Sequence, residues 1–521
     1  MIEIKGEGVT IDEVWQIAGG EAISETVAAW RGEHVRLSDV ARTRMRESRS
    51  YIEKAIADGE VIYGVNTGFG AFSSVRISDA DIEALQKNLI RSHSVGVGES
   101  FTRAETRAIM FLRANTLARG HSGVRPEVVE KIIEFLNHDI IPVIPSQGSV
   151  GASGDLAPLA HLALALIGEG EVWSAAGARH KTIEVLRANN LEPLQLKAKE
   201  GLSLINGCQV MTAVGLLAAR RARNLVLQAD LAGAMSLEAL RGSRTAFDPL
   251  ISETRPHPGE RKTARNLLRL LGETSEIAKS HEDCDRVQDA YSLRCMPAVH
   301  GAVKDSLRRA IETLEIEANA STDNPLVFAK QGKVLSCGNF HGEPVAFQLD
   351  FLAISLAAIG SISECRISKL INPNFSRLPA FLAVEGGLNS GMMIVQVAAA
   401  ALVSENKIHT HPASVDSIPT SVDKEDHVSM GTIAARKLRR VVDNLENILA
   451  MEMLCSVQAL ALLKPLRPAA GVAAAFDRLE NYVPLAKQDR VFGDDIRTIC
   501  HHIASGELLT LVSQKIGELE W

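Results

Sequence analysis

The sequence has few aromatic residues and no surplus of positive charge. Aromatic residues make up 4% of the 521 residues, whereas alanine and leucine recur throughout, and this balance favours packed helices over β-sandwiches or barrels. The formal net charge of −7 and the isoelectric point near 6.1 argue against a nucleic-acid surface, because phosphate binding needs a concentrated positive field. The composition therefore predicts a mainly α protein without a nucleic-acid partner.

Cysteine pairs and zinc-binding motifs are also missing. The seven cysteines are widely scattered, without a C-x-x-C pair, so neither a disulfide framework nor a zinc site is expected. Two close histidine pairs, His409 with His411 and His501 with His502, lack the spacing of a known zinc motif. The sequence thus predicts no metal site.

No targeting or membrane segment stands out. Residues 1–5 lack the basic-then-apolar order of a signal peptide, and no stretch reaches about 18 uninterrupted apolar residues. A soluble, cytoplasmic protein that does not bind a membrane is therefore expected.

The chain is longer than one ordinary domain. A soft boundary near residue 205 separates an N-terminal domain of shorter, mixed elements (1–205) from a long-helix bundle domain (206–521). Apolar periodicity predicts the long helices, most of them longer than the usual globular helix, at about 209–240, 345–370, 391–407 and 428–463.

Helix-start signals organise the N-terminal part. Ser78 precedes a helical pattern that runs to about His93, and Thr102 with Glu105 forms a capping box for the next helix. Pro126 suits the first turn of another helix, and a further one is expected near 155–167.

Two glycine-rich segments interrupt these helices. Residues 63–70 read Tyr-Gly-Val-Asn-Thr-Gly-Phe-Gly, which indicates an irregular loop. Residues 148–159 read Gly-Ser-Val-Gly-Ala-Ser-Gly-Asp-Leu-Ala-Pro-Leu. A plain turn or an anion site before a helix would also fit the second segment taken alone.

The second segment resembles the histidine and aromatic amino-acid ammonia-lyase family, and the resemblance extends from about Tyr63 to the helices beyond Met430. It implies that Ala152, Ser153 and Gly154 cyclise autocatalytically, with loss of two waters, to 4-methylidene-imidazol-5-one (MIO), so that no dissociable cofactor is needed. It also implies a helical bundle resembling the fumarase/aspartase superfamily, assembled as a homotetramer whose sites draw residues from three subunits.

The residue types in the triplet suit that chemistry. Gly154 has no Cβ, so its nitrogen can approach the Ala152 carbonyl, and Ser153 supplies the hydroxyl whose loss creates the alkene. Asp155 and Pro158 fit the opening turn of the following helix, whose dipole would favour negative charge on the ring.

The resemblance assigns further residues to the site. Tyr63 lies in a segment like the family's mobile inner loop and would be the base for the β-proton, which requires its pKa to be lowered by cationic or donor neighbours. A packed loop tyrosine is the alternative. Asn206 matches a residue that binds the substrate and the ring, and a helix N-cap is its alternative.

A second cluster would bind the substrate. Gln288, Tyr291 and Arg294 would share one face if helical. The resemblance implies that Arg294 grips the carboxylate bidentately and that Tyr291 lies near the ring. A half-exposed surface stripe would look the same. Phe340 matches a pocket-wall aromatic residue, though core packing would also explain it. Residues 322–325, Thr-Asp-Asn-Pro, match a structural turn beside the site.

Three positions favour histidine as the substrate. By the resemblance, His93 faces the substrate ring, although tyrosine enzymes also use histidine there. Glu425 stands where phenylalanine and tyrosine enzymes usually have glutamine. A carboxylate can accept a hydrogen bond from an imidazole N–H and can share or take a proton, so Glu425 is the alternative to Tyr63 as the base. A first-turn helix acid is the alternative for Glu425. Met393 also agrees with the histidine branch, and a core methionine would look identical.

The predicted reaction is the deamination of L-histidine to trans-urocanate and ammonia, the first step of histidine degradation. Asp423-Lys424 departs from the Asn-Gln that is common in the histidine branch, and this adds charge of both signs beside Glu425. A tyrosine or phenylalanine ammonia-lyase or aminomutase of the same family is the alternative. A non-catalytic assembly protein that retains the fold is a third interpretation.

Overall fold

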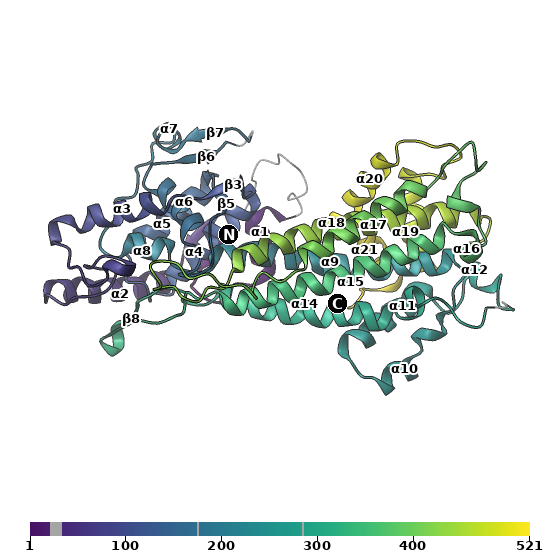
Figure 1. The fold of residues 1–521 in the computed structure, drawn as a ribbon, viewed down its shortest axis with the longest axis horizontal. Helices are drawn as coiled ribbons and strands as arrows, with labels where there is room; N and C mark the ends of the chain where they lie inside the picture. Colours follow the sequence, from purple (N-terminus) through teal and green to yellow (C-terminus); the bar gives the residue numbers. More distant parts are fainter. Residues whose placement is uncertain (21–33, 175–176, 284–285) are drawn as a thin grey trace. The chain divides into compact units, whose positions relative to one another are not determined.

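The computed structural model describes residues 1–20, 34–174, 177–283 and 286–521 (Figure 1). The contacts divide the chain into two compact units. The first unit comprises Met1–Leu217, Ile311–Asp350 and Pro412–Arg436, and the second comprises Ala218–Ala310, Phe351–His411 and Lys437–Trp521. The first unit thus continues past residue 205 and takes in two later segments. The boundary at residue 205 stays a prediction.

The first unit combines helices with short strands. Its helices are α1 (Ile11–Ala18), α2 (Asp39–Ala57), α3 (Ile82–His93), α4 (Arg103–Ala118), α5 (Pro126–Asn137), α6 (Leu156–Leu166), α7 (Thr182–Ala188) and α8 (Glu200–Ile205), with 3-10 turns at Gly70–Phe72, Asp79–Asp81 and Ala329–Gln331. Its strands are β1 (Ile2–Ile4), β2 (Val35–Leu37), β3 (Val97–Ser100), β4 (Ile141–Pro142), β5 (Pro145–Gln147), β6 (Glu171–Trp173), β7 (Arg179–Lys181), β8 (Leu326–Phe328) and β9 (Lys333–Leu335).

These strands pair only locally. β1 and β2 are parallel, with Ile2 opposite Val35, whereas β3 with β5, β4 with β6, β6 with β7, and β8 with β9 are antiparallel. The strands span two to four residues, so the helices supply most of the core. In α4, every residue from Glu105 to Ala118 is buried.

Four long helices contribute residues to both units: α9 (Gln209–Ala239), α14 (Met296–Ala318), α15 (Glu343–Leu370) and α18 (Gly431–Leu462). The second unit adds α10 (Pro249–Thr254), α11 (Pro258–Leu271), α12 (Glu276–Lys279), α13 (Tyr291–Arg294), α16 (Pro373–Ser376), α17 (Met393–His409), α19 (Ala470–Tyr482), α20 (Phe492–Ala504) and α21 (Glu507–Ile516), with 3-10 turns at Arg244–Phe247 and Ala380–Leu382. The prediction of a mainly α fold with long helices is confirmed.

Two predicted helix starts are confirmed. The Thr102 side chain accepts from the Glu105 backbone N–H while the Glu105 carboxylate accepts from the Thr102 N–H, so the capping box is complete. Pro126 opens α5. The start at Ser78 differs, because this residue precedes a 3-10 turn and α3 begins at Ile82.

Two helices, α15 and α18, are long and apolar enough to cross a membrane by length and composition alone. Buried core helices of soluble proteins pass the same test, and 83% of the most apolar part of α18 and 50% of that of α15 lie buried inside the protein. Both helices are therefore weak evidence for a membrane span.

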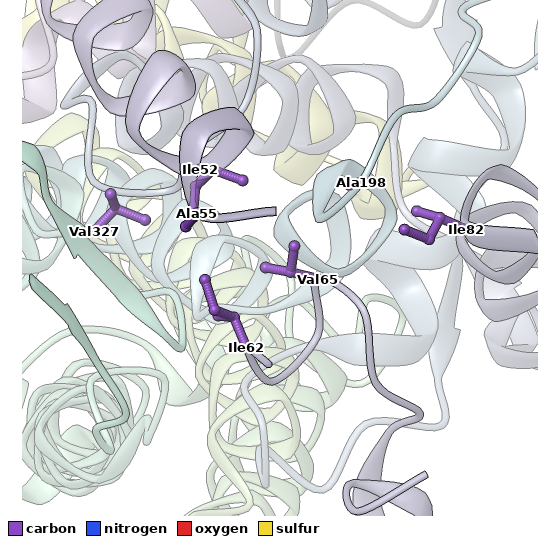
Figure 2. Packing of buried hydrophobic residues seen from close by; sticks show 7 residues of the cluster. All are labelled: Ile52, Ala55, Ile62, Val65, Ile82, Ala198 and Val327. Atoms are coloured by element: carbon purple, nitrogen blue, oxygen red, sulfur yellow. The ribbon is translucent and has the colours of Figure 1, made fainter. Parts of the chain in front are cut away.

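A hydrophobic cluster supports the glycine-rich loop that begins at Tyr63 (Figure 2). Ile62 and Val65, on either side of Tyr63, pack with Ile52 and Ala55 of α2. Ile82, Ala198 and Val327 complete the cluster. Burying an aliphatic side chain contributes roughly 1.5 to 3 kcal/mol, so the chain on both sides of Tyr63 is held in place.

Candidate active site

The Ala-Ser-Gly triplet lies between β5 and α6 and is held by the backbone of Gly207. The Gly207 N–H lies 3.2 Å from the Ser153 carbonyl oxygen, and the Asp155 N–H donates to the Gly207 carbonyl at 2.8 Å. Gly154 has a φ of +74°, and a Cβ added there would lie 2.2 Å from the Gly207 oxygen. Only glycine fits at position 154, for both conformational and steric reasons.

Asp155 ties the triplet to two long helices. Its Oδ2 accepts from the backbone N–H groups of Val210 and Met211, each at 3.0 Å, in the first turn of α9. Its Oδ1 accepts from Ser149 Oγ at 3.1 Å and from the Thr432 hydroxyl at the start of α18. Burial raises the pKa of Asp155, and these four donors oppose the rise. The carboxyl thus satisfies backbone donors that would otherwise be unpaired at a helix start.

Glu425 contacts the triplet directly. Ser153 Oγ donates to Glu425 Oε1 at 2.9 Å, and Thr420 Oγ1 donates to Oε2 at 2.7 Å. The Thr420 N–H also donates to the Glu425 carbonyl at 2.9 Å, closing a tight turn. Glu425 therefore lies in a turn before α18 and not in the first turn of that helix.

That turn has strained backbone. Ser421, Val422 and Asp423 have φ values of 52°, 56° and 59°, a region that non-glycine residues rarely adopt. Ser421 and Val422 line the cavity beside Glu425. Strain of this kind persists only where the surrounding structure holds it, and it is common at functional sites.

Apolar packing joins the triplet to the segment after Glu425. Ala152 packs with Val428 and Met430 in a buried cluster. The Met430 N–H donates to the Val150 carbonyl at 2.9 Å. Packing and hydrogen bonding therefore both join the segment that carries Ser153 to the segment that follows Glu425.

Tyr63 lies at the start of its loop, half-buried. Its hydroxyl oxygen lies 3.4 Å from the Gly70 N–H, which donates to it, and its ring meets Phe69 edge-on with centroids 6.5 Å apart. Burial raises the pKa of Tyr63 above its ordinary value of 10.0, the Gly70 donor lowers it, and the Glu425 charge raises it. The expected lowering of this pKa is therefore absent within the described part of a single chain.

His93 is the last residue of α3 and lines the same cavity as Tyr63. Its Nδ1 lies 2.9 Å from the Leu89 carbonyl oxygen, which can only accept. Ser92 Oγ also lies 3.0 Å from Nδ1. A proton on Nδ1 would be donated to the Leu89 carbonyl and would leave Nε2 of the neutral ring as an acceptor. Burial lowers the pKa of His93, against the raising effects of Leu89 and Glu425.

Asn206 ends α8 as its C-cap and is not a helix N-cap. Its Nδ2 donates to Asp323 Oδ1 at 3.1 Å and lies 3.4 Å from the Asn324 carbonyl. Its Oδ1 is buried without a hydrogen-bond partner among the described residues. This oxygen is therefore free to accept a hydrogen bond, and Asn206 lines the cavity described below.

Asp323 in turn is held by Lys199, which donates at 2.8 Å with both side chains fully buried. Burial alone would raise the pKa of Asp323, but the charges of Lys199 and Arg113 outweigh it and keep the pKa below its usual value. The ionised carboxylate fixes the amide orientation of Asn206. The Thr-Asp-Asn-Pro turn thus lies beside the site and orients Asn206.

These side chains surround one cavity of about 680 Å³ in the first unit. A volume of this order suits a small-molecule ligand. Tyr63, His93, Ser153, Asn206 and Glu425 all line it. A smaller adjoining cavity of about 320 Å³ is lined by Ala152 and Gly154 and shares His93 and Glu425.

The other candidate residues are absent from the lining of these two cavities. Phe340 is half-buried in the first unit, its carbonyl accepting from Cys208 Sγ at 2.9 Å, and it is absent from the lining of either cavity. Met393 is the first residue of α17 in the second unit.

In the second unit, Arg294 contacts both Gln288 and Tyr291. Arg294 Nη2 donates to Gln288 Oε1 at 3.3 Å, and its Nε donates to the Asp289 carbonyl at 3.2 Å. The guanidinium carbon lies 4.6 Å from the centre of the Tyr291 ring. Gln288 precedes α13, so the three residues do not form a helical face; the arginine folds back to reach the glutamine. Gln288 and Arg294 line a separate cavity of about 620 Å³.

Thr420 and Asp155 are site residues that the sequence analysis did not assign to substrate chemistry. Thr420 lies five residues before Glu425, and no motif marks it. Asp155 follows the triplet directly, so its position alone could have indicated a supporting role.

Known proteins are similar to this chain over most of its length. The family model "Aromatic amino acid lyase" matches residues 22–481. The chain is 51% identical over 500 residues to a histidine ammonia-lyase from Sorangium cellulosum, covering 94% of this chain and 97% of that protein.

Two solved structures extend the likeness to the fold. The crystal structure of histidine ammonia-lyase from Trypanosoma cruzi matches with a TM-score of 0.90 at 42% identity, over 99% of this chain and 95% of that one. Tyrosine aminomutase from Streptomyces globisporus matches with a TM-score of 0.92 at 37% identity, over the whole of both chains. The chain therefore belongs to the aromatic amino acid lyase family.

Proposed function

We propose that this protein catalyses the non-oxidative deamination of L-histidine to trans-urocanate and ammonia, the first step of histidine degradation, in the cytoplasm. The observation that carries the proposal is the contact between Ser153 Oγ and the Glu425 carboxylate in a cavity that His93 also lines. It puts an acceptor for an imidazole N–H beside the Ala-Ser-Gly triplet. The similarity to histidine ammonia-lyases over nearly the whole chain supports the same substrate.

The residues at the triplet fit a methylidene-imidazolone formed from Ala152, Ser153 and Gly154, without a dissociable cofactor. Cyclisation forms a bond between the Gly154 nitrogen and the Ala152 carbonyl carbon and releases two waters. Position 154 excludes any side chain, and the buried Oδ1 of Asn206 offers an unused acceptor in the cavity. When formed, the ring supplies an electrophile that activates the substrate amino group for departure.

Side chains of the cavity would remove the β-proton and bind the substrate imidazole. Tyr63 removes the β-proton and Glu425 accepts from the imidazole N–H, in a cavity that His93 also lines. Burial raises the pKa of Tyr63 here. A cation brought close to its hydroxyl in the assembled site would lower the pKa, as a base at neutral pH requires.

Such an assembled site implies a homotetramer in which subunits share active sites. Arg294 and its two partners are grouped in the second unit, and the Tyr291 side chain is 72% exposed. Apolar side chains on α15 and α17 are exposed as well, including Ile354, Ile394 and Val397. Exposed apolar residues on long helices are typical of surfaces that pack against another subunit.

Arg294→Lys should lower kcat/KM for histidine by about ten- to a hundredfold. Lysine keeps the charge but loses the fork of donors and the stacking on Tyr291 that orients it; one lost charge-assisted bond is worth about 1.5 to 3 kcal/mol. Steady-state kinetics measure the effect. Arg286→Lys, in the same cavity, is the matched control and should lose much less. An unchanged constant in Arg294→Lys would place the carboxylate site elsewhere.

Glu425→Gln should shift substrate preference away from histidine. The amide keeps the shape of the side chain but removes the charge that favours an imidazole N–H, so histidine turnover should fall while any trace activity on tyrosine or phenylalanine holds or rises. The ratio of kcat/KM for histidine to that for tyrosine is the measurement. A ratio equal to that of the unmodified enzyme would show that Glu425 does not select the substrate.

Product stoichiometry tests the reaction itself. Histidine should yield urocanate and ammonia in equal amounts, without oxygen uptake. Tyrosine or phenylalanine ammonia-lyase or aminomutase activity is the alternative. It should be assayed as well, because the chain is similar to a tyrosine aminomutase. A β-amino acid formed without free ammonia would overturn the lyase assignment.

A further inference from the structure

Three potential metal ligands meet in the first unit outside the catalytic contacts described above. They are His341, Glu343 and His427, and their ligand atoms all lie within 4.8 Å of one another. Glu343 Oε2 lies 3.9 Å from His341 Nδ1 and 3.9 Å from His427 Nε2. Glu343 begins α15, and His427 follows Glu425 by two residues.

The spacing is close to that of a metal site. Zinc binds imidazole nitrogen and carboxylate oxygen at about 2.0 to 2.2 Å, which puts neighbouring ligands of a tetrahedral site roughly 3.3 to 3.5 Å apart. Each distance from Glu343 would need to shorten by about half an ångström. A rotamer adjustment of His427, whose side chain is 70% exposed, can supply part of this movement.

Hydrogen bonding already orients His341 as a ligand. Its Nε2 lies 3.2 Å from the His427 carbonyl oxygen, which can only accept, so Nε2 carries the proton and Nδ1 the lone pair that faces Glu343. Metal-binding histidines are usually oriented in this way, by a carbonyl at the second nitrogen. The Glu343 N–H, 3.3 Å from Nδ1, is the weak donor that a cation would replace.

Glu343 has a carboxylate oxygen without a hydrogen-bond partner among the described residues. This oxygen, Oε2, is buried. At 3.9 Å, both imidazoles are too far from this oxygen for a hydrogen bond. A proton on either ring therefore leaves this oxygen unbonded, whereas a cation among the three groups would bind it.

We propose that His341, Glu343 and His427 form a site for a divalent transition-metal cation, with Zn²⁺ as the best match. Two imidazoles and one carboxylate leave a fourth position open. The cation would tie the turn that carries Phe340 to the turn that carries Glu425. The sequence alone does not indicate this site, because the third ligand lies 84 residues from the second and no motif joins them.

Metal titration of the full-length protein tests the site. Untagged protein, stripped with a chelator and free of amino-acid substrate, should bind one Zn²⁺ per chain by calorimetry. Co²⁺ should give the visible absorption of a four-coordinate site with nitrogen and oxygen ligands. Glu343→Gln and His427→Gln should each weaken Zn²⁺ binding by at least about tenfold, because each removes a ligand.

His409→Gln is the matched control. His409 lies 3.3 Å from the Glu405 carboxylate at the end of α17. This pair also combines an imidazole with a carboxylate, but it lacks the second histidine of the proposed site. It should leave the binding unchanged. Circular dichroism shows whether each variant is folded, and His341→Ala provides a further ligand deletion. The proposal is overturned if the folded wild type binds no Zn²⁺, or if ligand variants bind as tightly as the control. Neither result depends on which amino acid the enzyme deaminates.

Discussion

Ser153→Ala should abolish deamination, lowering kcat by at least about a thousandfold. The variant lacks the hydroxyl whose loss creates the alkene, so no electrophile can form, and removing the essential group of a catalytic unit has effects of this size or larger. Initial rates with histidine measure the loss. The hydroxyl that donates to Glu425 Oε1 is itself lost on cyclisation, so the mature enzyme does not depend on this hydrogen bond.

Intact mass reports the cyclisation directly. The unmodified protein should be lighter than its translated sequence by the mass of two waters, and Ser153→Ala should retain its full translated mass. Ser421→Ala is the matched control, because Ser421 also lines the cavity but lies outside the triplet; it should lose the two waters. Full turnover by Ser153→Ala would show that the electrophile has been assigned to the wrong residues.

Tyr63→Phe should lower kcat/KM by at least about a hundredfold, the usual contribution of a general base. A base acts when deprotonated, and the pKa of Tyr63 is raised by burial, so activity should rise with pH through the neutral range and this rise should be lost in the variant. Rate profiles against pH, with histidine deuterated at the β-carbon, report the proton transfer.

Tyr51→Phe is the control for Tyr63→Phe. Tyr51 packs against the hydrophobic cluster of Figure 2, so the change removes one hydroxyl from the same unit and should leave the pH profile intact. A near-normal rate in Tyr63→Phe would transfer the role of base to Glu425, whose carboxylate lies beside Ser153.

Local signals predicted the helices well. The bounds of α9, α15, α17 and α18 lie within about three residues of those expected from periodicity, because long amphipathic patterns and strong caps specify helices from nearby residues. The chain segments that make up each of the two units could not be predicted from the sequence. Segments 311–350 and 412–436 return to the first unit, and such returns depend on long-range packing that periodicity does not record.

The site could be predicted only in part, for the same reason. Tyr63, His93, Ser153, Asn206 and Glu425 do line one cavity, as motif resemblance had grouped them. The roles of Thr420 and Asp323 depend on hydrogen bonds to those residues, which only coordinates reveal. The raised pKa of Tyr63 comes from burial, a property of the folded surroundings that spacing cannot supply.

Substrate preference tests the assignment of L-histidine as the substrate. The specificity constant kcat/KM should be measured for L-histidine, L-tyrosine and L-phenylalanine under the same conditions. Histidine should be preferred by at least about tenfold, because a phenyl edge would leave the Glu425 carboxylate unpaired, at about 1 to 3 kcal/mol. A higher constant for tyrosine or phenylalanine would contradict the assignment of histidine and leave only the family's lyase chemistry standing.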